Sequence, residues 1–313
     1  MVVHGNRLED LRGLAVSWMQ RAPLSPLENE TILVQSNGIA QWLKLALAED
    51  PRGPGQGCGI AAAIDVQLPA RFLWRAYRLV LGRDKLPETS SLDRNGLTWR
   101  LLRLLPAQLD HESFLPLRRF LADDASMRKR HQLAERLADL YDQYQVYRAD
   151  WLDDWEHGRD VLRTSRRGTV PLAAEDRWQP ALWRALLADV GDDGLIQSRA
   201  GVHRRFVARM AQLDAPPPGL PRRVIVFGIS SMPAQALEAL AALAKFSQVL
   251  LCVHNPCQHH WADIVADQDL LRHQYRRQQR RPGMPATLDA ETLHNFGNPL
   301  LAAWGKQGRD YIH

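Results

Sequence analysis

The chain has 313 residues, of which 45% are hydrophobic, so it is long and apolar enough for two packed domains or one domain with a large insertion. Its 40 Lys and Arg residues against 35 Asp and Glu give a net charge of +5, which suits a nucleic-acid partner without requiring one. Three cysteines are too few for a disulfide framework, and we find neither an apolar run of about 18 residues nor a hydrophobic leader. We therefore expect a cytoplasmic protein without a membrane partner.

The first 68 residues carry the pattern of an α/β unit. Apolar residues recur at helical spacing over Leu8–Gln20, and Thr31–Ser36 is a continuous apolar run typical of a buried strand. A polar turn follows, then a helical pattern over Ile39–Glu49, and Ile60–Val66 predicts a second short strand. Strand, turn and helix in this order open an α/β fold.

The pattern changes from Pro69 to about Met210. Apolar residues now recur every three or four positions, and the breaks carry Pro, Gly and acidic residues, which predicts a block of helices. The block ends at the Pro-rich segment Asp214–Pro221. Beyond that segment, Val224–Gly228 and Val249–Val253 predict buried strands on either side of a helix over Pro233–Ala244.

These patterns predict an α/β fold with a parallel sheet that is interrupted by a large helical insertion. Leu300–Tyr311 resembles the start of a helix, and the chain then stops at His313 without a polar tail or cap, so we expect the chain to be a piece of a longer protein. The predicted domains are residues 1–68 for the first part of the α/β domain, 69–213 for the helical insertion and 214–313 for the second part of the α/β domain.

The turn after the first buried strand is where an ATPase of this architecture would hold phosphate. A phosphate-binding loop needs several glycines and a terminal Gly-Lys-Ser/Thr. Here Gln35–Gln41 has one glycine and no Lys followed by Ser or Thr, and no acidic pair that would hold magnesium follows the strand at Val224–Gly228. We therefore expect an NTPase-like fold that has lost its nucleotide chemistry, so that this chain is not itself an enzyme and holds neither cofactor nor metal.

Two further clusters admit a functional and a plain interpretation. Cys252, His254, Cys257, His259 and His260 lie within nine positions, but they lack a standard zinc spacing, which favours a buried cysteine and a polar loop. The basic run Arg272, Arg276, Arg277, Arg280 and Arg281 would suit phosphate or a solvated surface equally well.

The helical pattern around Asp139 and Asp142 places two carboxylates at positions i and i+3, which can share one helix face. Such a pair is compatible with metal or acid–base chemistry or with reading of cytosine edges. Ordinary ion pairing is the interpretation that the residues favour. The ten tryptophans likewise suit stacking on unpaired bases, although most of those at helical spacing are expected in the core.

Taken together, several segments resemble the N-terminal part of the RecC family, the gamma subunits of the RecBCD helicase–nuclease (exodeoxyribonuclease V). The resemblance runs in order along the whole chain and departs around Arg83–Asn95, Gly158–Asp176 and Gln278–Glu291. It rests on Asn6–Leu8, Ile32–Ser36 with Gly38, Ala40–Leu43, Gly59–Ala62, Leu68–Ala70, Asp139–Leu140, Asp142–Tyr144, Val146–Arg148, Asp150–Trp151, Pro218–Pro221, Asn255–Cys257, Asn298–Ala302, Trp304–Lys306 and Gly308–Tyr311.

The resemblance implies a helicase-like fold without ATPase motifs, in a subunit about three times longer than this chain. It implies a non-catalytic DNA-binding subunit for double-strand-break repair by homologous recombination, with RecB-like and RecD-like subunits and unwound single-stranded DNA as partners. In that complex the partner subunits use ATP and Mg, and the RecC-like subunit scans the 3′ strand for the sequence Chi.

The resemblance also implies a set of Chi-reading residues, which we expect to line a channel between the α/β part and the helical block. Amide, carboxylate and guanidinium groups can pair with base edges, and Trp and Leu can pack on bases. Asn37 stands where the family example has Thr. The set is Gln35, Asn37, Gln41, Leu68, Trp74, Asp139, Leu140, Asp142, Arg148 and Arg199.

Two other functions compete with DNA scanning. The chain could serve as an interaction scaffold that docks partner subunits or an inhibitor and has little DNA affinity of its own. An active helicase or nuclease is disfavoured by the missing motifs.

Overall fold

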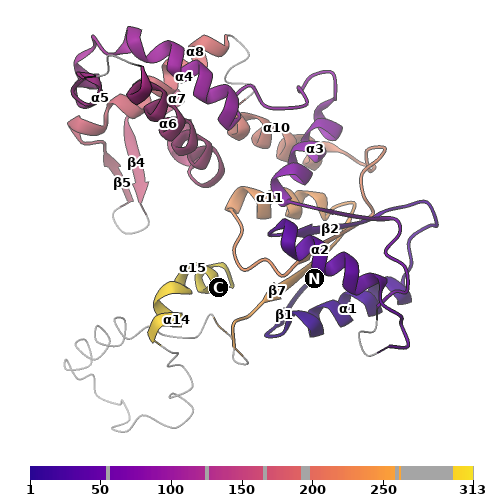
Figure 1. Cartoon of the computed structure of the whole chain (residues 1–313). Helices are drawn as coiled ribbons and strands as arrows, with labels where there is room; N and C mark the ends of the chain where they lie inside the picture. Colours follow the sequence, from indigo (N-terminus) through magenta and orange to yellow (C-terminus); the bar gives the residue numbers. More distant parts are fainter. Residues whose placement is uncertain are drawn as a thin grey trace, which may run out of the picture. The chain divides into compact units, whose positions relative to one another are not determined.

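The computed structural model describes residues 1–53, 57–123, 127–164, 168–191, 198–257, 261 and 299–312 (Figure 1). The chain forms two compact units, which we call the sheet unit and the helical unit. The sheet unit comprises Met1–Phe72, Pro221–Met232 and Phe246–His313, and the helical unit comprises Leu73–Leu220 and Pro233–Lys245. No helix among the described residues has the length and apolar character needed to cross a membrane. The predicted domain limits at 68/69 and 213/214 stay predictions.

The sheet unit is built on a five-stranded sheet in the order β1-β7-β6-β2-β3, in which all neighbouring strands are parallel. This confirms the predicted α/β fold with a parallel sheet. The strands are β1 (Val2–Gly5), β2 (Glu30–Val34), β3 (Ile64–Gln67), β6 (Arg223–Phe227) and β7 (Gln248–His254). Among the described residues, the helices that belong wholly to this unit are α1 (Leu8–Arg21), α2 (Asn37–Ala48), α14 (Pro299–Trp304) and α15 (Lys306–Ile312).

The central strands carry continuous apolar runs, Ile32–Val34 and Val224–Phe227, as is typical of a parallel sheet with both faces covered. Ile32, Ile225 and Leu250, which the register aligns across three neighbouring strands, form one core cluster with side chains of α1 and α2. Every residue of β6 is buried, and so is Leu33 on β2. The predicted strands at these positions are therefore confirmed.

Buried Arg223, at the start of β6, is an exception to this apolar pattern, with only 1% of its surface exposed. Its guanidinium donates to Glu30 Oε1 at 2.7 Å, to Gln248 Oε1 at 3.2 Å and to the carbonyl of Ala22. It also lies 4.8 Å from the centre of the Trp18 ring. Burial raises the pKa of Glu30, and the charge of Arg223 opposes that rise. The ion pair thus joins the two central strands inside the sheet unit.

The helical unit consists mainly of the helices between β3 and β6 in the chain. These are α3 (Pro69–Leu81, whose first turn belongs to the sheet unit), α4 (Arg94–Gln108), α5 (Leu115–Leu121), α6 (Arg128–Tyr147), α7 (Ala149–Glu156), α8 (Trp178–Val190) and α10 (Arg199–Gln212). Helix α11 (Ala234–Leu243) follows β6 and packs with α10. Leu101, Tyr141, Trp155 and Trp183 form the centre of the core, where the rings of Tyr141 and Trp183 stack at 5.5 Å.

The structure adds two strand features that the sequence patterns did not predict. Strand β1 pairs in parallel with β7, and an antiparallel hairpin of β4 (Val161–Thr164) and β5 (Gly168–Pro171) interrupts the predicted helical block. Both strands of the hairpin are only four residues long, and all of their residues are partly or fully exposed. Their sequences therefore lack the apolar run that marks a buried strand.

Candidate nucleic-acid interface

The four predicted residues of the sheet unit lie at one edge of the sheet. Gln35 directly follows β2, and Asn37 and Gln41 lie one turn apart on α2. The parallel register aligns Leu33 with Gln67, which brings Leu68 to the same carboxyl edge of the sheet, where it is 38% exposed. In open α/β sheets ligands bind at this edge, outside the carboxyl ends of the strands.

The first turn of α2 is fixed while its polar side chains stay available. The Ser36 side chain caps the helix by accepting a hydrogen bond from the Ile39 amide at 3.3 Å. The side chains of Gln35, Asn37 and Gln41 are exposed and make no hydrogen bond to another residue that the structure describes. Each amide therefore presents a donor and an acceptor to a ligand from a fixed backbone.

On α6 of the helical unit, the two predicted carboxylates bind different arginines. Asp142 Oδ1 lies 3.0 Å from Arg199 Nη2 on α10, so two predicted residues are in direct contact. Asp139 instead lies 3.6 Å from Arg94 Nε on α4 and accepts a hydrogen bond from Gln143 at 3.2 Å. Of the metal or acid–base, base-reading and ion-pair interpretations of these two carboxylates, the structure shows ordinary ion pairs. Leu140 packs partly buried against the helical core.

Trp74, on α3, is held in one orientation. Its indole Nε1 donates to the carbonyl oxygens of Pro87 and Glu88, at 3.3 and 2.9 Å. One edge of the ring meets Tyr77, with the ring centres 6.4 Å apart. The indole is only partly buried, so a fixed aromatic ring remains accessible to a base.

Tyr77 links α3 to α10 and α11 through a polar chain that begins at the buried Tyr77 and His203 and ends at the exposed Glu238. Its hydroxyl lies 2.9 Å from Nδ1 of His203, and Nε2 of His203 lies 2.9 Å from Glu238 Oε2. Burial raises the pKa of Tyr77, the charge of Glu238 adds to this rise, and Arg199 opposes it. Tyr77 therefore stays neutral, and Arg199 is near enough for its charge to act on the Tyr77 hydroxyl.

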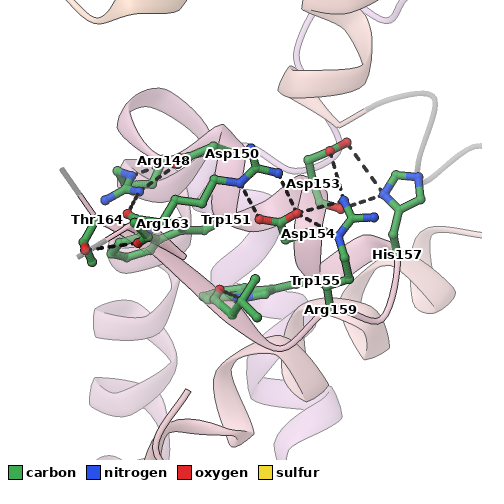
Figure 2. Close-up of polar contacts among 12 residues, drawn as sticks. Arg148, Asp150, Trp151, Asp153, Asp154, Trp155, His157, Arg159, Arg163 and Thr164 are labelled. Atoms are coloured by element: carbon green, nitrogen blue, oxygen red, sulfur yellow. Dashed lines mark hydrogen bonds and ion pairs between the residues drawn. The ribbon is translucent and has the colours of Figure 1, made fainter. Parts of the chain in front are cut away.

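Arg148, at the end of α6, is held by its neighbours on α7 and β4 (Figure 2). It donates to both carboxylate oxygens of Asp150, at 3.0 and 2.7 Å, and to the carbonyl of Arg163. Its guanidinium carbon lies 3.7 Å from the centre of the Trp151 ring. Such a bidentate, stacked arginine has a fixed direction.

Beside Arg148 lies a charged cluster that sequence reasoning missed (Figure 2). Asp154, 1% exposed, accepts hydrogen bonds from Arg163 at 2.6 and 2.8 Å and from Arg159 at 2.9 Å. The hydrogen bonds from Arg163, with those from Arg159, lower the pKa of Asp154 to about 2 although burial opposes them. The sequence does hold a signal for this cluster, because three aspartates within five positions are followed by two arginines. The pairing of Asp154 with Arg163 could not be predicted, however, because Arg163 lies on the hairpin that the sequence patterns did not predict.

The predicted clusters elsewhere are only partly visible. No group of three or more metal-ligating side chains occurs among the described residues. Cys252 is buried in β7, and this burial raises its pKa to about 12. His259, His260 and the basic run over 272–281 lie outside the described residues.

Comparisons with known proteins place the chain in a family. A sequence model described as "RecC, N-terminal domain" matches residues 1–313. The chain is 40% identical to the RecBCD enzyme subunit RecC of Escherichia coli and 34% identical to that of Haemophilus influenzae, covering 100% of this chain but 28% and 30% of those proteins. The RecBCD enzyme subunit RecC of Mycolicibacterium smegmatis is 26% identical, over 99% of this chain and 25% of its own length. The chain thus spans less than a third of these relatives, and it belongs to the RecC family through the family's N-terminal domain.

Proposed function

We propose that this chain is the DNA-reading N-terminal part of a RecC-type subunit of a RecBCD enzyme. It binds single-stranded DNA from the unwound duplex, scans the 3′ strand for Chi and does not hydrolyse ATP. The observation that carries this proposal is the row of unengaged amides, Gln35, Asn37 and Gln41, at the carboxyl edge of the sheet. The family match and the relatives' names support it.

The same edge of the sheet supports the proposed absence of ATP chemistry. Between β2 and α2 lie only Gln35 and Ser36, and a side-chain hydroxyl caps the helix. A phosphate-binding loop needs a longer, glycine-rich turn whose amides surround the phosphates. We therefore propose a helicase-like fold without its nucleotide site, so that ATP and Mg are used by RecB-like and RecD-like partner subunits in the cytoplasm.

The predicted polar side chains offer different pairings for base reading. Glutamine and asparagine pair with adenine edges, aspartate accepts from cytosine N4, and arginine pairs with guanine. Trp74 offers a stacking surface and Leu68 an apolar contact. Because Asp142 and Arg199 already pair with each other, a base that binds either one must compete with their ion pair. We propose that residues of each unit take part in reading the strand.

The full enzyme complex gives the test of this function. Gln35→Ala or Asp142→Ala, introduced into the complete RecC-type subunit, should abolish the response of nuclease activity to Chi and spare the unwinding rate. Gln20→Ala removes a similarly exposed amide from α1 and should change neither quantity. Loss of unwinding in both test variants would contradict the assignment of these residues to base reading.

A second function, docking of partner subunits, is favoured by a different observation. Trp99 on α4 is 66% exposed and Phe120 on α5 is 53% exposed. Large aromatic side chains at the surface are typical anchors of protein interfaces. If docking is the main role, Trp99→Ala should weaken capture of the RecB-like subunit in a pull-down while single-stranded DNA binding stays unchanged.

A further inference from the structure

The helical unit contains a cavity of about 690 Å³ that no predicted residue lines. It lies between α3, the connection from α3 to α4, and the first turns of α4. Its volume falls within the ~300–1,000 Å³ typical of ligand sites. The groups that line it are mostly cationic and hydroxylic, and they include Arg78, Arg83, Lys85, Ser90 and Arg100.

The wall formed by the α3–α4 connection is fixed to α3. Trp74 Nε1 donates to the carbonyl of Glu88 at 2.9 Å, and Arg78 Nε donates to the carbonyl of Leu86 at 3.1 Å. Trp74 and Arg78 are one turn apart and so lie on one face of the helix. The Leu86 side chain is fully buried beneath the connection. The cavity is therefore preorganised, and one of its walls is held by the Trp74 indole.

The opposite wall is equally ordered. Ser90 Oγ accepts from the Leu92 amide at 3.2 Å, and Gln145 on α6 donates to the Leu92 carbonyl at 2.9 Å. Asp93 caps α4 by accepting from the Gly96 amide at 2.7 Å. The Asp93 carboxylate is thus directed to its own helix.

The charge of the cavity is positive. Four cationic side chains and two acidic ones, Asp84 and Asp93, line it, which gives +4 − 2 = +2. Arg100 is paired with Asp189 outside the lining, at 2.6 Å. Arg83 and Lys85 are exposed and form no ion pair with any residue the structure describes. Both remain available to an anion, and an arginine fork with a lysine suits phosphate oxygens.

We propose that this cavity binds a backbone phosphate of single-stranded DNA, next to the base that stacks on Trp74. The inference rests on the proposed DNA-reading function and adds an interaction that is independent of base sequence. The phosphate would fix the register of the strand, while the base-reading side chains select its sequence. A free polyphosphate has the same chemistry, so the test must separate it from a DNA backbone.

The test measures DNA binding by the 313-residue chain over a salt series, using fluorescence anisotropy. Arg83→Gln/Lys85→Gln removes two charges, and removal of one phosphate-binding charge lowers the slope of log affinity against log salt by ~0.7 for a single strand. We expect a decrease of about 0.7–1.4, equal for all base sequences and also present with an oligonucleotide of abasic sites. Arg118→Gln/Arg119→Gln removes the same charge from exposed positions of α5 and should leave the slope unchanged.

The outcomes separate this inference from the proposed function. If the wild-type chain binds DNA and the Arg83/Lys85 variant keeps its slope, the cavity is not a phosphate site although the function stands. If the wild-type chain binds no DNA, the proposed function fails for this chain. Binding of tripolyphosphate then shows whether the cavity is a phosphate site. Tripolyphosphate binding that the double variant loses would then assign the cavity to free polyphosphate. Absence of that binding would overturn the proposal.

Discussion

The buried ion pair of the sheet unit gives a stability prediction that can be worked out in detail. Arg223→Met keeps an apolar side chain of similar length but removes every donor of the guanidinium, together with the stacking of that group on the Trp18 ring. The Glu30 carboxylate then stays buried without its cation, and the Ala22 carbonyl loses a donor. Removing one partner of a buried ion pair lowers the free energy of unfolding by ~3–5 kcal/mol. Because methionine fills much of the volume of the arginine side chain, we expect a loss of about 3 kcal/mol.

The sign of the pH dependence follows from Glu30. Burial already raises the pKa of Glu30, and loss of Arg223 removes the group that opposes this rise. An acid whose folded pKa lies above its unfolded value destabilises the fold as pH rises from the unfolded pKa to the folded one. The loss of stability caused by Arg223→Met should therefore be smaller at pH 5 than at pH 8. Arg223→Met/Glu30→Leu should regain most of the loss, because an apolar pair replaces the ion pair.

Hydrogen exchange followed by mass spectrometry measures this loss within the sheet unit. A loss of about 3 kcal/mol corresponds to a roughly hundredfold increase in the exchange rate of β2 and β6 amides, since 1.4 kcal/mol is a factor of ten. Peptides from α4, in the helical unit, serve as the internal control. A change below about 1 kcal/mol, or a double variant that loses the sum of both single effects, would refute this explanation of the ion pair.

Three further predictions concern the helical unit. The folded pKa of Asp154 is about 2, below the unfolded value near 4, so its stabilisation is present above pH 4 and lost as pH falls towards 2; Asp154→Asn should flatten the acid limb of a tryptophan-fluorescence titration. Tyr77→Phe removes the hydroxyl bonded to His203 and should cost about 1–2 kcal/mol in urea unfolding; an unchanged midpoint would contradict that bond. Trp74→Ala should lower DNA affinity by about 1–3 kcal/mol in anisotropy, whereas Trp99→Ala should not; equal effects would remove the special role of Trp74.

The sequence predicted those parts of the fold whose stability comes from their own residues. The runs that became β2 and β6 are apolar at every core position, and the helical patterns of α4, α6 and α8 repeat over several turns. Strand β1 has only two apolar residues and exists because it pairs with β7, about 250 positions later. The β4–β5 hairpin likewise depends on α7, whose Trp151 and Trp155 donate to carbonyls of β4.

For the candidate site, the chemistry of single residues was predictable but their partners were not. The sheet-edge position of Gln35 and Asn37 follows from a strand–turn–helix pattern, so sequence reasoning can reach it. The pairing of Asp142 with Arg199 joins helices α6 and α10, which only tertiary packing brings together. The same holds for Arg83 and Lys85, whose place in the lining of one cavity depends on the packing of the α3–α4 connection, which Trp74 holds through the Glu88 carbonyl.

Binding of single-stranded DNA by the 313-residue chain, followed by fluorescence anisotropy from low to high salt, tests the central claim most directly. We expect binding that weakens steeply with salt, because binding to phosphates releases counterions. We also expect Gln35→Ala to lower the affinity for the best-bound sequence by at least about 1 kcal/mol, or roughly fivefold, while Gln20→Ala leaves it unchanged. Absence of binding at low salt would contradict the claim and would assign this chain to partner docking instead.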